Sequence, residues 1–169
     1  MPDIPDDTFA PSPAFGEGTV WADRTGRCEL VGRNQRGVEI PIGHGEGRIS
    51  PGELLKLALI GCAGMSADFT ISRRLGDDFP MRLLAHGTSA EESNRYEEID
   101  EEIQLDLSGL DEAGQERLRR LILQAIGVGC TVERTLVADP EIRHGIVDVP
   151  ARGRVAMPEP SDAPEGERA

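Results

Sequence analysis

The sequence predicts an α+β domain in which antiparallel strands are combined with two main helices. Apolar and polar residues alternate in two regions, 19–42 and 81–107, as they do in strands that bury one face. Between these regions, residues 54–69 form a nearly unbroken apolar run behind a helix start signal. After the second region, Leu118–Ala125 carries apolar residues at helical spacing.

The first region predicts three short strands. We expect the first turn at Arg24-Thr25-Gly26 and the second at residues 34–37, because both segments are rich in turn-forming residues. In the third strand, apolar residues at 38, 40 and 42 alternate with Glu39 and Pro41. Cys28 alternates with Leu30, so we interpret it as a core residue of the second strand.

Ser50-Pro51 predicts the start of the first helix, because serine caps a helix and proline needs no hydrogen-bond donor at its first position. Between Leu54 and Phe69 the only charged residues are Lys56 and Asp68. A helix that is apolar all round needs cover all round. A small sheet covers one side, so we expect a second helix or a second subunit on the other.

The second alternating region predicts a long hairpin of residues 81–85 and 99–107 with one wet face. We interpret Glu97, Glu98, Glu101 and Glu102 as a solvated strand face or as protection of a sheet edge. The amphipathic helix that follows should end at the glycine-rich residues 127–129. A short helix over residues 131–138 and a last strand over 144–149 complete the prediction.

Proline density defines the expected boundaries of the domain. Eight of the twelve prolines lie in residues 1–18 and 150–169, where hydrophobicity is low. We therefore predict a folded domain over residues 18–149 between disordered tails at 1–17 and 150–169.

Composition argues against several classes of function. The net charge of −13 disfavours binding to nucleic acid or to anionic lipid. We find no stretch long and apolar enough to span a membrane, and the first residues do not resemble a secretory signal. Three widely spaced cysteines do not suggest a disulfide framework, so we expect a cytoplasmic protein.

The sequence offers no evident metal or cofactor site. His44, His86 and His144 stand far apart and at none of the usual ligand spacings. The glycines at 43, 45 and 47 do not match a dinucleotide-binding fingerprint. We therefore expect neither a metal nor a cofactor.

Two cysteines and a helix opening carry a resemblance to a known family. Ser50-Pro51-Gly52-Glu53-Leu54-Leu55 is followed by Cys62, eleven residues after the proline, and Cys130-Thr131-Val132 follows the second helix. This pattern resembles the OsmC/Ohr family of osmotically inducible and organic hydroperoxide resistance proteins. Arg24 resembles the arginine that family members carry in their first hairpin.

The resemblance implies an intertwined homodimer in which antiparallel sheets wrap around central helices. It further implies a thiol peroxidase. Cys62 would attack an organic hydroperoxide and become a sulfenic acid, and Cys130 would condense with it to a disulfide. A dithiol such as protein-bound lipoamide would restore the thiols.

An apolar helix raises the pKa of a thiol, so the Cys62 thiolate needs a cation. Arginine stays charged when desolvated, which makes Arg24 our candidate and Arg27 the alternative. Gly52 stands where peroxidase members have a glutamate that braces this arginine, which places the chain in the subgroup lacking it. Glu53 lies nine residues before Cys62, on the opposite side of a helix, so its expected role is charge in the first turn.

Two other functions fit the same residues. The apolar cleft of the dimer could bind a hydrophobic small molecule with the cysteines as spectators. The Cys62–Cys130 pair could also act as a redox sensor that forms a disulfide without turning over a substrate.

Overall fold

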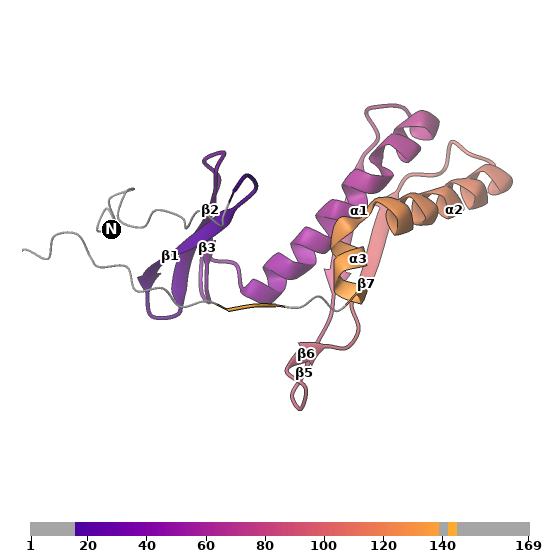
Figure 1. Ribbon diagram of the computed structural model, residues 1–169. Helices are drawn as coiled ribbons and strands as arrows, with labels where there is room; N and C mark the ends of the chain where they lie inside the picture. The colour runs from indigo at the N-terminus through magenta and orange to yellow at the C-terminus, as the bar shows by residue number, and fades with distance from the viewer. Residues whose placement is uncertain (1–15, 139–141, 145–169) are drawn as a thin grey trace, which may run out of the picture. The chain divides into compact units, whose positions relative to one another are not determined.

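The computed structural model describes residues 16–138 and 142–144. Within it, Val20–Ile142 forms one compact unit. The unit combines antiparallel strands with three helices, which confirms the predicted α+β class. Figure 1 shows the elements in chain order.

The predicted tails, residues 1–17 and 150–169, lie outside the described residues apart from Gly16 and Glu17. The strand predicted over residues 144–149 also lies outside them, except for His144.

The first three strands form one antiparallel sheet in the order β1-β2-β3. They are β1 (Val20–Gly26), β2 (Glu29–Asn34) and β3 (Glu39–Ile42). The predicted second turn is confirmed, because the Asn34 side chain accepts hydrogen bonds from the backbone N–H groups of Arg36 and Val38.

The predicted first turn is wrong. β1 continues through residues 24–26, since Gly26 still pairs with Glu29, and the chain turns at Arg27 and Cys28. Cys28 adopts a left-handed backbone with φ 57° and is exposed. Its alternation with Leu30 had suggested a core residue, but Cys28 is a turn residue and lies outside the core.

The first helix, α1 (Pro51–Leu75), begins as predicted. Ser50 caps it in a capping box, in which the Ser50 hydroxyl accepts from the Glu53 N–H and the Glu53 carboxylate accepts from the Ser50 N–H. These hydrogen bonds from the Ser50 backbone and hydroxyl hold the pKa of Glu53 below its usual value. Glu53 is therefore fixed at the helix start, which confirms that it serves the first turn.

Two other structures cover α1. The hairpin of β4 (Met81–His86) and β7 (Asp100–Leu105) packs on it through β4, with a smaller hairpin of β5 (Ser89–Ala90) and β6 (Arg95–Tyr96) at its far end. A Cβ at Gly64 would lie 2.9 Å from the Leu83 Cδ1, so glycine permits this close approach. The other cover is α2 (Glu112–Gly129), and α3 (Thr131–Val137) follows it.

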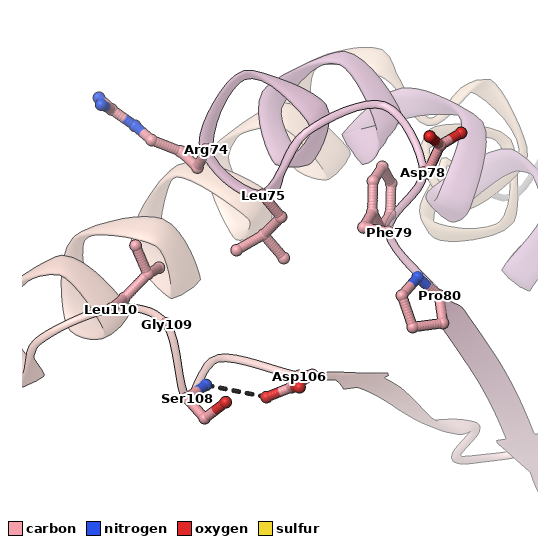
Figure 2. Close-up of a pocket in the computed structure, with 9 residues that line it drawn as sticks. All are labelled: Arg74, Leu75, Asp78, Phe79, Pro80, Asp106, Ser108, Gly109 and Leu110. Carbon is pink, nitrogen blue, oxygen red and sulfur yellow. Dashed lines mark hydrogen bonds between the residues drawn. The ribbon is translucent and has the colours of Figure 1, made fainter.

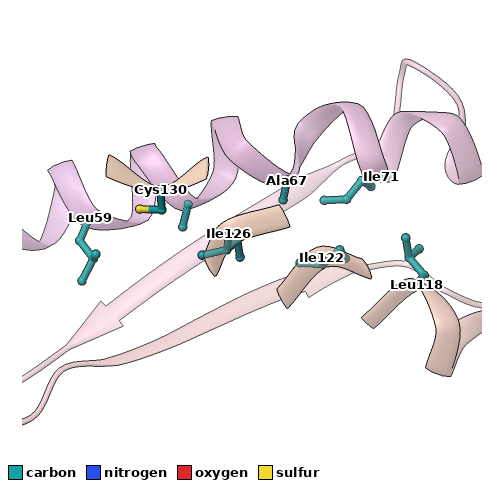
Figure 3. Close-up of a cluster of buried hydrophobic side chains, with 8 residues drawn as sticks. Leu59, Ala67, Ile71, Leu118, Ile122, Ile126 and Cys130 are labelled. Carbon is teal, nitrogen blue, oxygen red and sulfur yellow. The ribbon is translucent and has the colours of Figure 1, made fainter. Parts of the chain in front are cut away.

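The core lies mainly between α1 and α2. Figure 3 shows apolar side chains from the two helices facing one another. The cluster consists of Leu59, Ala63, Ala67, Ile71, Leu118, Ile122, Ile126 and Cys130. On β7, Ile103 and Leu105 pack against the same cluster.

One side of α1 remains uncovered. Leu57, Met65 and Phe69 are 51%, 84% and 69% exposed, and they lie four to eight residues apart along one row of the helix. The expected covering helix is present as α2, but this row of α1 stays exposed.

The same helix corrects the expectation that no segment could span a membrane. α1 has 25 residues, and an 18-residue window of it has a mean hydropathy of 1.5, which suffices by length and composition. Lys56 and Asp68 do not interrupt the apolar run enough to prevent this.

Candidate functional site

The structure brings two of the three predicted site residues together. Cys62 lies in the middle of α1, half-buried beside the core cluster. Cys130 is fully buried at the junction of α2 and α3, where it caps both helices. Its thiol lies within hydrogen-bonding reach of the Cys62 thiol, and both cysteines are free.

The surroundings of Cys62 favour its thiolate. The backbone N–H of Val132 hydrogen-bonds to its sulfur and is the main reason that the pKa of Cys62 lies below the ordinary value. Burial opposes this shift, while the Cys130 thiol, the Thr131 N–H and the Ser66 hydroxyl add to it. Backbone N–H groups at the start of α3 thus stabilise the thiolate, a role that the sequence analysis expected an arginine alone to fill.

Cys130 is shifted in the opposite direction. Burial raises the pKa of the Cys130 thiol, although the Glu133 N–H donates to its sulfur at 3.4 Å. The neighbouring Cys62 and Glu133 charges raise this pKa further. Cys62 is therefore the thiol that ionises first, and Cys130 is the hydrogen-bond donor beside it.

Cys62 borders an open apolar groove of about 630 Å³. The groove is lined by apolar residues of α1 and by the end of α2. Its lining residues are Leu57, Ala58, Gly61, Cys62, Met65, Ser66 and Gly129. An alkyl or aromatic group placed here would lie beside Cys62.

The third predicted residue, Arg24, lies on β1 and is exposed. It pairs with Leu30 across the sheet, and Leu30 pairs in turn with Ile42, so these side chains share one face. Leu30 is 36% exposed. Among residues 16–138 and 142–144, Arg24 forms no ion pair, and neither does the alternative Arg27. Both arginines stay candidates as the cation for Cys62.

Other arginines in this region are already paired, which the sequence did not reveal. Arg33, on the opposite face of the sheet, binds Asp23 and Glu39, and Arg48 binds Glu29 at 2.8 Å. The hydrogen bond to Glu39 is the main reason that the pKa of Arg33 is raised. Asp23, the neighbour of Arg24 in the sequence, is thus paired with Arg33. The cross-strand register was the missing signal, since it places Arg33 on the face of Asp23.

Gly52 has a steric reason to be glycine. A Cβ at this position would collide with the hydroxyl of Tyr96 from β6. The Lys56 Nζ lies 5.0 Å from the centre of the same ring. Tyr96 therefore occupies the space that a side chain at position 52 would need.

A second hollow of about 400 Å³ lies near the end of α1, more than three helical turns beyond Cys62. Figure 2 shows that Arg74, Asp78 and Asp106 lie around it, with Asp106 accepting a hydrogen bond from the Ser108 N–H. It contains neither cysteine, so we assign it no part in thiol chemistry. Within the described ranges, no group of three histidine, cysteine or acidic residues is arranged to hold a metal ion.

Comparisons with known proteins agree with this fold. No family model matches the chain. Uncharacterized protein Rv2923c of Mycobacterium tuberculosis is 41% identical over 134 residues, which cover 78% of this chain and 98% of that protein. Uncharacterized protein Mb2948c of Mycobacterium bovis matches to the same extent.

Two solved structures are similar in fold. A crystal structure of a hypothetical protein from Aquifex aeolicus VF5 has a TM-score of 0.56 at 17% identity, covering 71% of this chain and 86% of that one. A protein from Psychrobacter arcticus 273-4, named for osmotic stress induction and a detoxification response, has a TM-score of 0.56 at 21% identity, covering 72% and 89%. At these identities the likeness establishes the fold. The chain belongs to the same family as the two mycobacterial proteins, and its fold is of the OsmC/Ohr type.

Proposed function

We propose that the protein is a thiol peroxidase that reduces organic hydroperoxides with Cys62 and Cys130. The observation that carries the proposal is a pair of adjacent thiols beside an apolar groove, whose surroundings lower the pKa of Cys62 and raise the pKa of Cys130. A thiolate is the nucleophile, and a neutral second thiol beside it is suited to resolve the oxidised product.

The reaction has three balanced steps. The Cys62 thiolate attacks one oxygen of the O–O bond, the alkoxide leaves and takes up a proton, and Cys62 becomes a sulfenic acid. The Cys130 thiol then attacks the Cys62 sulfur, which forms the disulfide and releases water. A dithiol reductant, such as a protein-bound lipoyl group, reduces the disulfide and is itself oxidised to a disulfide.

We also propose that the working form is a homodimer. The chain leaves two apolar surfaces uncovered, one on α1 and one on the sheet face that holds Arg24. The α1 surface includes Leu57, Met65 and Phe69, and the sheet face includes Val20, Leu30 and Ile40. A second copy that lays its sheet face on this α1 would cover both surfaces and bring an unpaired arginine toward Cys62.

The test is turnover of cumene hydroperoxide by the full chain with dihydrolipoamide as reductant. We expect activity in the unaltered protein, its loss in Cys62→Ser, and its retention in the control Cys28→Ser, because Cys28 is an exposed turn residue. Absence of turnover in the unaltered protein would overturn the proposal.

The apolar groove also supports a second candidate, a module that binds a hydrophobic small molecule without turnover. Native mass spectrometry that detects a bound apolar ligand in both the unaltered protein and Cys62→Ala would favour this function. The proposed peroxidase would act in the cytoplasm, where a thiol pair is kept reduced.

A further inference from the structure

An acidic residue lies close to the thiols, on the helix α3 that follows Cys130. Glu133 is in the first turn of α3, three residues after Cys130, and its backbone N–H donates to the Cys130 sulfur at 3.4 Å. Its side-chain Oε2 is shielded from solvent and has no hydrogen-bond partner within the described part of the chain. A shielded carboxylate oxygen without a partner is costly, so it calls for an explanation.

Strand β7 carries a second carboxyl group, that of Glu101, on which the charge of Glu133 acts. Glu101 lies on the face of β7 that also holds Ile103 and Leu105, but unlike them it is exposed. Burial and the charge of Glu133 raise the pKa of Glu101.

From the position of Glu133 beside Cys130, and given the proposed function, we propose that Glu133 is the proton acceptor for Cys130 when the disulfide forms. The acceptor atom is the unpartnered Oε2 of Glu133, reached from the Cys130 thiol directly or through one water molecule. The groups whose charges act on Cys130 are Cys62 and Glu133, and Glu133 acts in turn on Glu101.

The Cys130 thiol gives its proton to Glu133, and the resulting thiolate attacks the sulfenic sulfur of Cys62. The new S–S bond replaces the S–O bond, so the Cys130 sulfur is oxidised by one unit and the Cys62 sulfur is reduced by one. The hydroxide that leaves takes the proton from the Glu133 carboxyl group and departs as water.

The experiment measures disulfide formation within the chain in two ways. In the first arm, one equivalent of cumene hydroperoxide oxidises the full protein. In the second arm, oxidised glutathione replaces the peroxide, so that Cys62 first forms a mixed disulfide and Cys130 then displaces glutathione. Both arms need Cys130 to lose its proton, but only the first needs peroxidase chemistry.

The variant is Glu133→Gln, and the matched control is Glu102→Gln, which removes the same charge from the outer face of β7. We expect Glu133→Gln to slow disulfide formation about 10²-fold near neutral pH, the scale of a lost general base. Its residual rate should rise with hydroxide concentration, whereas a structural defect would not be rescued by pH. Glu133→Asp should recover part of the rate.

The outcomes separate the two proposals. A slow Glu133→Gln in the glutathione arm, with an unaltered protein that ignores the peroxide, supports the proton acceptor and overturns the peroxidase. Equal rates for Glu133→Gln and Glu102→Gln in both arms overturn the proton acceptor and leave the peroxidase standing.

Discussion

The two sides of α1 have similar composition but different surroundings. The covered side presents Leu59, Ala63, Ala67 and Ile71 to α2, and these residues are at most 7% exposed. The uncovered side presents Leu57, Met65 and Phe69, each more than half exposed. The apolar surface of this helix therefore exceeds what a single chain buries.

Breaking the covered side should have the largest effect on folding. Ile71 is fully buried, so Ile71→Ala should lower the free energy of unfolding by about 2–5 kcal/mol, through lost transfer energy and a cavity. Urea unfolding monitored by circular dichroism measures this loss. It should be the same at every protein concentration, because the contacts lie within one chain. A loss below about 0.5 kcal/mol, typical of surface positions, would contradict the packing of α1 on α2.

Breaking the uncovered side should act on association. Phe69→Asp places a charge in the surface that we propose a second copy covers. The free energy of dimer dissociation should therefore fall by roughly 2 kcal/mol or more, the scale of an interface hot spot. Sedimentation velocity at a concentration where the unaltered protein is a dimer checks this, with the helical circular dichroism signal unchanged. An unaltered protein that stays monomeric and binds lipid vesicles through α1 would contradict the dimer and favour a membrane surface.

Periodicity predicted the elements of this fold well. The alternation at 38–42 and 81–85, the Ser50-Pro51 start and the glycines at the end of α2 all correspond to observed boundaries. The first turn was missed because Arg24-Thr25-Gly26 looks like a turn, while backbone pairing carries the strand to Gly26 and bends the chain at Cys28. Local turn propensity was overruled by the sheet register.

The candidate site could be predicted only in part. The resemblance to the OsmC/Ohr family, carried by the positions of Cys62 and Cys130, predicted the pair that the structure brings together. The donors from Thr131 and Val132 could not be predicted, because backbone N–H groups leave no trace in side-chain chemistry. Tyr96 was missed for a different reason, since it reaches Gly52 from a small hairpin far along the chain.

The contact of Tyr96 with Gly52 tests how closely the start of α1 is packed. Gly52→Ala should lower the free energy of unfolding by about 1–3 kcal/mol, because the added methyl group collides with the Tyr96 hydroxyl. Tyr96→Phe removes that hydroxyl and leaves the nearest ring carbon at 3.3 Å, so the double variant should regain most of the loss. Chemical unfolding of the two single variants and the double variant gives the coupling energy. Additive losses would show that the ring does not fill this position.

The smallest expected effect concerns the ionisation of Cys62 by the start of α3. Thr131 is the first residue of α3 and Cys130 before it is extended, so proline fits the backbone there and removes one N–H donor to the Cys62 sulfur. Loss of a donor to the thiolate should move the pKa of Cys62 upward, toward the ordinary thiol value. Fewer thiolates then exist at neutral pH, and alkylation of Cys62 by iodoacetamide should be slower there but equal at high pH. Val132 keeps the stronger donor, so the shift should be partial. An unchanged pH profile in Thr131→Pro would mean that the remaining donors hold the thiolate without Thr131, whereas a downward shift of the pKa would contradict the role of backbone donors altogether.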